Sequence, residues 1–115
     1  MKFELIKKLD GLEMYGYIPC LPIECNDEGE RFVGEEADSW LLLEDFVPEI
    51  DKLFDNLLDY GDVDYLDAGK CELIKKWLDN RMQEEISPRL RDLYNVLYGY
   101  VTRAIDLGTG VVIEL

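Results

Sequence analysis

The sequence has no histidine, only three cysteines, and fewer than half as many basic as acidic residues. Without histidine, the chain alone forms neither a Ser-His or Cys-His nucleophile pair nor a zinc site with histidine ligands. It also has no run of about 20 apolar residues and no basic, apolar leader after Met1, the patterns of a membrane span and a secretory signal. We therefore predict a cytoplasmic protein that does not bind membranes.

The cysteines, Cys20, Cys25 and Cys71, are odd in number, which fits a reducing compartment better than a disulfide framework. Three thiolates are too few for a closed four-sulfur zinc site, although a carboxylate would complete a three-thiolate site. We favour the interpretation that all three are buried, inert thiols. Accordingly, we expect no metal and no cofactor.

The 115 residues, of which 48% are hydrophobic, are enough to form one domain with a sizeable core. This apolar content also argues against global disorder. We predict a single domain over residues 1–115.

The acidic residues are concentrated in the middle of the chain. From Glu24 to Asp67, sixteen acidic residues accompany two basic ones, Arg31 and Lys52, whereas the rest of the chain has ten of each. The whole net charge of −14 therefore lies in this segment. Such a field repels nucleic acid and anionic membranes and attracts cationic surfaces. The alternative is that these acids only keep a small protein soluble.

The C-terminal region predicts a long helix followed by a strand. Ser87 and Pro88 suit the N-cap and first position of a helix, and Gly108 suits its end. Between them, apolar residues recur at steps of three and four, which predicts a central helix covered on more than one side. These residues are Leu90, Leu93, Leu97, Val101, Ala104 and Ile105, with Tyr94, Tyr98 and Tyr100 widening the apolar arc. The β-branched run from Val111 to Leu115 predicts a strand.

The N-terminal region predicts strands. Residues Lys2–Leu9 and Leu12–Ile18 both alternate between apolar and polar side chains, and Asp10-Gly11 separates them. An Asp-Gly pair between alternating runs is a strong signal for an antiparallel hairpin. Arg31–Val33 predicts a third, short strand, and we interpret Trp40–Leu43 as extended or irregular.

Two further helices are predicted in the middle of the chain. The first starts at an Asp45 N-cap and ends near Tyr60-Gly61; its apolar face is Phe46, Val47, Ile50, Leu53, Phe54, Leu57 and Leu58. An acidic linker, Asp62–Leu66, leads to a second helix that is capped by Asp67 and ends by Glu85. Its buried stripe is Leu73, Ile74, Trp77, Leu78 and Met82. We place both tryptophans, Trp40 and Trp77, in the core.

Together these elements predict an α+β domain. A small antiparallel sheet, made of the N-terminal hairpin and the C-terminal strand, would carry the three helices on one face.

No motif for catalysis or for metal binding is present. A calcium loop that starts at Asp62 would need glycine at its sixth position, where Asp67 stands. Gly108-Thr109-Gly110 follows a helix and precedes a strand, which is the reverse of a phosphate-binding loop. We therefore assign no catalytic, cofactor-binding or metal-binding residue and predict that the protein is not an enzyme.

The acidic segment and its tyrosines are the candidate binding site. An amphipathic ring beside carboxylates suits recognition of arginine and lysine by hydrogen bonds and cation–π contacts, although strand packing also explains tyrosine. We predict that this surface binds a basic protein and that Asp55, Asp59, Asp62 and Asp64 face solvent. The complete set is Glu44, Asp45, Asp51, Asp55, Asp59, Tyr60, Asp62, Asp64 and Tyr65.

A small acidic α+β domain with an anionic stretch such as Glu44–Asp67 resembles the bacterial immunity proteins that neutralise nuclease or other toxins. The resemblance implies a non-enzymatic inhibitor that docks electrostatically on a basic partner, either a toxin or a nucleic-acid-binding protein, without binding nucleic acid itself. It assigns no role to any individual residue.

Three alternatives remain. The same electrostatics suit a nucleic-acid mimic of the anti-restriction or anti-CRISPR type. A structural or assembly protein would instead form homo-oligomers through an exposed sheet edge or helix face. An enzyme that uses carboxylates with a divalent metal ranks last.

Overall fold

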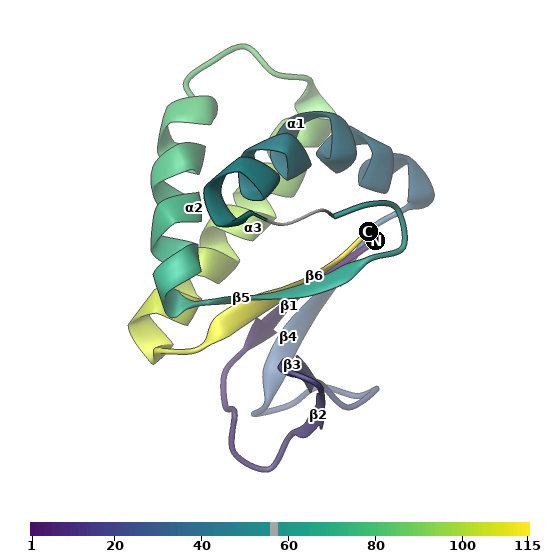
Figure 1. The fold of residues 1–115 in the computed structure, drawn as a ribbon, viewed down its shortest axis with the longest axis vertical. Helices are drawn as coiled ribbons and strands as arrows, with labels where there is room; N and C mark the ends of the chain where they lie inside the picture. The colour runs from purple at the N-terminus through teal and green to yellow at the C-terminus, as the bar shows by residue number, and fades with distance from the viewer. Residues whose placement is uncertain (56–57) are drawn as a thin grey trace.

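A computed structural model describes residues 1–55 and 58–115, and this part of the chain forms six strands and three helices (Figure 1). In chain order they are β1 (Lys2–Ile6), β2 (Glu13–Tyr15), β3 (Ile18–Cys20), β4 (Gly29–Val33), α1 (Glu36–Phe54), β5 (Val63–Asp67), α2 (Ala68–Arg81), α3 (Pro88–Leu107) and β6 (Gly110–Glu114). None of the described helices combines the length and the apolar character that crossing a lipid bilayer requires.

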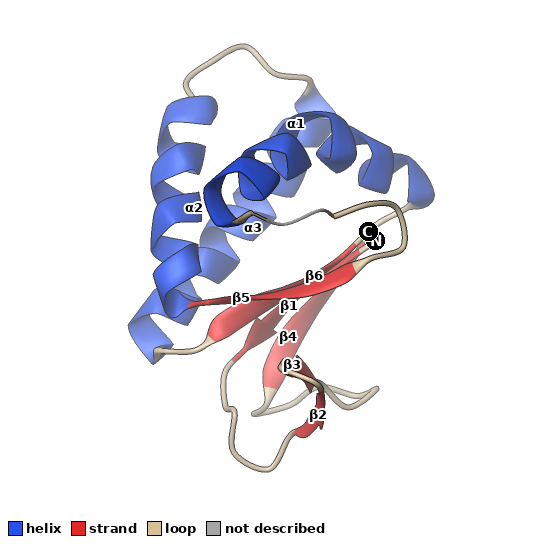
Figure 2. Cartoon of the chain, viewed as in Figure 1, coloured by secondary structure: helices blue, strands red, loops and turns tan. Residues whose placement is uncertain are grey.

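The main sheet is antiparallel throughout, with strand order β4-β1-β6-β5. The two ends of the chain form its centre, because Lys2 on β1 pairs with Glu114 on β6 and Ile6 pairs with Gly110. The helices cover one face of this sheet, and the small β2–β3 hairpin lies toward the other (Figure 2). The predicted α+β class, with three helices on one face of a small antiparallel sheet, is confirmed.

The core lies between the sheet and the helices. The alternation of the central strands directs Phe3, Leu5, Val111 and Ile113 into it, and all four are fully buried. On α3, the predicted central helix, Leu93, Tyr94, Leu97, Val101 and Ala104 are also fully buried. Apolar burial of this extent is the main stabilising contribution to the fold.

Local capping signals specify where α2 and α3 begin and where α3 ends, as predicted. The hydroxyl oxygen of Ser87 accepts the N–H of Leu90 at 3.3 Å, and a carboxylate oxygen of Asp67 accepts the N–H of Lys70 at 2.9 Å. Gly108 ends α3 in the left-handed region with φ of 69°, which costs glycine less than any residue with a side chain.

The predicted N-terminal hairpin is wrong, although the turn at Asp10-Gly11 is present. β1 pairs with β4 on one side and with β6 on the other, so neither of its edges is available to the residues that follow the turn. The hairpin instead joins β2 to β3 through Gly16 and Tyr17. Gly16 has φ of 62°, the conformation that tight hairpin turns require.

The first helix begins earlier than predicted. α1 starts at Glu36, so Trp40–Leu43 is helical rather than extended. Its N-cap is Glu35, whose backbone N–H donates to the carboxylate of Asp38 in the first turn at 2.9 Å. Pro48 therefore lies inside the helix, where it cannot donate a backbone bond. Burial of α1 residues on both sides of this point compensates for the missing bond.

The middle of the chain also departs from its prediction. α1 ends at Phe54, and Leu57, which we placed on its apolar face, lies outside the described residues. The predicted linker is largely strand β5, because the central strand β6 offers a free edge for it to pair with. α2 ends at Arg81, and Leu73 of its predicted stripe is 48% exposed.

Candidate functional site: an acidic and aromatic surface beside a groove

Two aromatic side chains from distant parts of the chain stack on the surface. Trp40 on α1 and Tyr60 before β5 have ring centroids 5.0 Å apart and ring planes inclined by 6°. Both remain exposed, at 50% and 47%, so the prediction that Trp40 lies in the core is wrong. The carboxylate of Glu36, one helical turn before Trp40, raises the pKa of Tyr60 through its negative charge.

The turn that carries Tyr60 is held by its own aspartates. Asp59 accepts the N–H of Tyr60 at 2.7 Å, and Asp62 accepts the N–H of Asp59 at 2.8 Å. Gly61 donates to the carbonyl of Leu115 at 2.6 Å, and the N–H of Leu115 donates to the carbonyl of Asp62 at 3.0 Å. Because the turn is bonded to Leu115, Tyr60 is held in place before any binding partner docks.

We call the exposed residues gathered here the acidic–aromatic surface. Its members are Glu36, Trp40, Asp59, Tyr60 and Asp62, and every one of them is exposed. The sequence predicted Asp59, Tyr60 and Asp62 as partner-binding residues but missed Glu36 and Trp40. The signal that could have found them was the Glu35-x-x-Asp38 pattern at the start of α1, since that start places Glu36 one turn before Trp40.

The remaining predicted partner-binding residues have different surroundings. Glu44 and Asp55 are exposed, whereas Asp51 and Tyr65 are half-buried. Asp51 on α1 accepts the N–H of Leu58 at 3.1 Å, so it holds Leu58 in place. Burial raises the pKa of Tyr65, whose ring packs over the Cα of Gly110.

Asp45 is half-buried and belongs to a hydrogen-bond network between the helices. Its carboxylate accepts from Arg81 on α2 at 2.9 Å and from the hydroxyl of the fully buried Tyr94 on α3. Burial raises the pKa of Asp45, but these two donors outweigh burial and lower it overall. This carboxylate therefore joins three helices and is poorly placed to meet a partner.

Asp64 is buried, with 3% of its surface exposed, so the expectation that it faces solvent is wrong. It accepts the hydroxyl hydrogen of Tyr17 and the N–H of Tyr65. The hydrogen bond to Asp64 raises the pKa of Tyr17. This prediction failed because strand β5 was not predicted. Pairing of β5 with β6 places Asp64 opposite the buried Ile113.

The acidic segment does not form one continuous face. Its β4 part lies at one edge of the sheet and its β5 part at the opposite edge. Several of its carboxylates are neutralised within the fold: Glu30 pairs with Lys7 and Arg103, and Asp38 pairs with Arg89 at 2.7 Å. The candidate site is therefore the part around α1 and the start of β5.

A groove adjoins this surface on the sheet face opposite the helices; we call it the hairpin groove. It has a volume of about 450 Å³. Its floor crosses the sheet and consists of Lys2, Glu4, Arg31, Val63, Val112 and Glu114. The hairpin supplies the opposite wall with Tyr15 and Ile18, Leu21 just after the hairpin adds to it, and the Tyr60 turn contributes Gly61 and Asp62.

Arg31 attaches the segment after the hairpin to the sheet. Its Nε donates to Glu4 at 2.6 Å, and its terminal nitrogens donate to the carbonyls of Ile23 at 2.8 Å and Pro22 at 3.1 Å. These bonds maintain the separation between hairpin and sheet that forms the groove.

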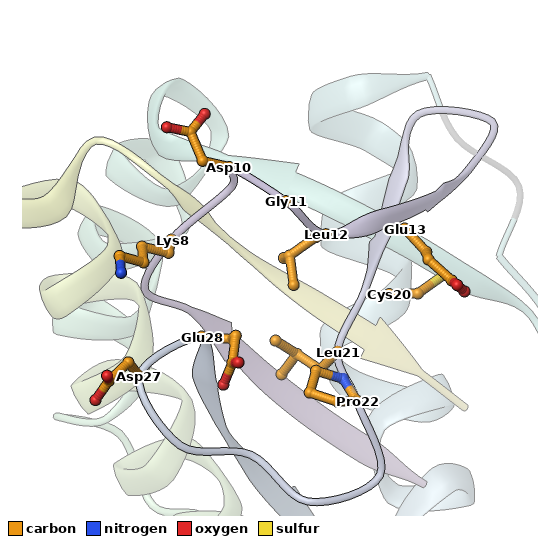
Figure 3. Close-up of a pocket in the computed structure, with 10 residues that line it drawn as sticks. All are labelled: Lys8, Asp10, Gly11, Leu12, Glu13, Cys20, Leu21, Pro22, Asp27 and Glu28. Carbon is orange, nitrogen blue, oxygen red and sulfur yellow. The ribbon is translucent and has the colours of Figure 1, made fainter.

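A second hollow, of about 580 Å³, lies within the loops before and after the hairpin. Figure 3 shows Leu12 and Leu21 in its middle, with Asp10 and Asp27 at its periphery. Its lining carries a single cationic side chain, Lys8, and the described residues contain no group of three or more potential metal ligands. It offers no arrangement of reactive groups.

The three thiols differ in exposure, so the expectation that all are buried is wrong. Cys71 is fully buried, and burial raises its pKa to about 12. Cys25 is half-buried, and Cys20 is exposed on β3. In the folded protein, the thiol of Cys20 in the hairpin therefore remains accessible to solvent.

Comparison of the chain with protein-family models, curated proteins and solved structures gives no match.

Proposed function

We propose that this protein binds a basic protein through its acidic–aromatic surface and acts by occupying that partner rather than by catalysis. The observation that carries the proposal is the Trp40–Tyr60 stack, half-exposed and flanked by the carboxylates of Glu36, Asp59 and Asp62. Aromatic anchors are enriched at the centres of protein interfaces. Carboxylates beside them favour arginine and lysine.

The order already present in this surface favours binding. The Asp59–Asp62 turn holds Tyr60 against Trp40 in the free protein, so little conformational entropy is lost when a partner docks. The net charge of −14 would increase the rate of encounter with a cationic surface, and salt would reduce this effect.

In its specific form, the proposal is that the partner is a toxin or another nucleic-acid-binding protein. Such proteins present a cationic groove, and an acidic protein that covers it competes with nucleic acid. We propose inhibition of this kind in the cytoplasm, where three free thiols fit a reducing environment.

The experiment is affinity capture from the source cell, followed by titration of the purified partner at low and high salt. Glu36→Lys should weaken binding at least tenfold, since it places a positive charge beside the aromatic stack. Glu72→Lys is the matched control, an exposed glutamate on α2 that undergoes the same change of charge. Equal effects of both substitutions would mean that net charge alone attracts the partner, and the proposed surface would be wrong.

Self-association is a second candidate function. β4 is an edge strand, its last residue Val33 is 65% exposed, and Ile23 nearby in sequence is 93% exposed. Exposed edges of this kind pair with other chains. Sedimentation equilibrium tests this candidate: Val33→Lys should abolish a concentration-dependent dimer, and a strictly monomeric wild type would remove the candidate.

A further inference from the structure

We propose that the hairpin groove receives an arginine side chain of the basic partner. The inference rests on the proposed function for the source of that arginine. The shape and the charges of the groove favour arginine.

The groove has the size and the apolar walls of a binding pocket. Its volume of about 450 Å³ falls within the usual range for ligand sites, about 300–1,000 Å³. Ile18 from the hairpin and Val63 and Val112 from the sheet give it apolar surfaces. These would contact the methylene stem of a long side chain.

The charges of the groove leave one carboxylate without a cation. Lys2 pairs with Glu114 at 3.3 Å, and Arg31 pairs with Glu4 at 2.6 Å, so four of the charged groups neutralise one another. The fifth is Asp62, for which residues 1–55 and 58–115 provide no ion pair. Its Oδ2 accepts the N–H of Asp59, which leaves Oδ1 to accept from a guanidinium. A ligand with a positive end therefore completes the charge balance of the groove.

Tyr15 favours arginine over lysine. Tyr15 lines the groove and is 79% exposed, so its ring can accept a cation on one face. A planar guanidinium stacks on such a ring while its N–H groups bond to a carboxylate, whereas an ammonium is compact and more strongly hydrated.

The groove and the acidic–aromatic surface share Asp62, and Gly61 next to Tyr60 also lines the groove. One partner could therefore place a basic face against Trp40 and Tyr60 and insert a neighbouring arginine into the groove. Both contacts would form in a single docking event.

The test is a nuclear magnetic resonance titration of the ¹⁵N-labelled full chain with N-acetyl-arginine methylamide. The expected result is saturable shifts of the groove amides of Tyr15, Val63 and Val112, with a dissociation constant on the order of 1 mM, as befits so small a ligand. The citrulline analogue has nearly the same shape without the charge and should cause no saturable shift. Equal shifts with citrulline, or arginine shifts spread over acidic sites outside the groove, would overturn the proposal.

Two valines provide a matched pair of variants. Val63 and Val33 occupy one cross-strand row at opposite edges of the sheet, and Val63 lines the groove whereas Val33 does not. Val63→Trp should fill the groove and abolish the arginine shifts, while Val33→Trp should leave them unchanged. Retention in both variants, or loss in both, would overturn the proposal.

Asp62→Asn is a milder variant that keeps an oxygen to accept the N–H of Asp59. It should weaken arginine binding about tenfold, because one charge-assisted hydrogen bond is lost. Unchanged binding would count against the proposal.

The results also distinguish a wrong groove assignment from a wrong proposed function. If Val63→Trp still binds the basic partner at full affinity, the groove assignment alone fails. If arginine binds in the groove and no basic protein binds at all, the proposed function fails.

Discussion

Arg31 and Glu4 form an ion pair at 2.6 Å on the sheet face opposite the helices, and both side chains are largely shielded from water, at 20% and 11% exposure. The same guanidinium holds the carbonyls of Pro22 and Ile23. Arg31 thus attaches Pro22 and Ile23, which follow the hairpin, to the sheet.

Arg31→Met should lower the free energy of unfolding by about 2–4 kcal/mol, because it leaves the Glu4 carboxylate shielded and unpaired. Hydrogen exchange should also become faster in the hairpin segment. Urea unfolding measures the first effect. Arg103→Met is the control: its ion pair with Glu30 is 46% exposed on the arginine side, so about 1 kcal/mol or less should be lost. Equal losses in the two variants would contradict the role given to Arg31.

Leu97→Ala should cost about 2–5 kcal/mol, since this side chain of α3 is fully buried and its truncation leaves a cavity. Leu107→Ala, in the last turn of the same helix, removes a side chain that is 49% exposed and should cost less than about 1 kcal/mol. Thermal or urea unfolding provides both values. A loss well under 1 kcal/mol for Leu97→Ala would remove α3 from the centre of the core.

Acid should destabilise the protein partly through Glu30. Arg103 and Lys7 lower the pKa of its carboxyl from an ordinary value of 4.5 to about 2. Because the folded-state pKa is the lower one, the stabilisation is present above pH 4.5 and is lost as the pH falls toward 2. Solvent keeps the contribution small, since the side chain is 39% exposed. Urea midpoints measured across this range should fall less steeply in Glu30→Gln, and identical slopes would contradict the assignment.

The thiols should react in the order of their exposure. Cys20 is exposed, whereas the pKa of Cys71 is raised to about 12 by burial, so Cys71 has almost no thiolate at neutral pH. Iodoacetamide should label Cys20 in the native protein and Cys71 only after unfolding. Mass spectrometry of the digested protein reads out each site, and labelling of native Cys71 as fast as Cys20 would show that the core is open.

Signals confined to neighbouring residues predicted the fold well. Ser87, Pro88 and Gly108 delimit α3 because capping depends on a few adjacent residues. The pairing of the C-terminal strand with the N-terminal one was also predicted, since an apolar strand at the end of the chain needs neighbours. The pairing of β1 with β4 was not predicted, because the strand that occupies this edge of β1 lies more than 20 residues away in the sequence.

The candidate site was predicted only in part, because the sequence does not show which of its acidic residues the fold buries. Asp59, Tyr60 and Asp62 are exposed as expected, whereas Asp45 is half-buried and bonded to Arg81, and Asp64 is buried and bonded to Tyr17. Both partners lie far away in sequence. Charge counted along a chain does not show which carboxylates the fold neutralises. Trp40 was missed because its neighbours, Leu41–Leu43, form an apolar run that suits a strand as well as a helix.

The measurement that tests the central claim most directly is the fluorescence of Trp40 on binding. The chain has two tryptophans, so Trp40 is the sole emitter in Trp77→Phe and Trp77 is the sole emitter in Trp40→Phe. Titration with the basic partner should shift the Trp40 emission to shorter wavelength, reversibly with salt, because docking removes water from the stacked rings. The packed Trp77, in contact with Phe46 and Tyr94, should stay unchanged. Binding of the partner with no change in Trp40 emission would contradict the account.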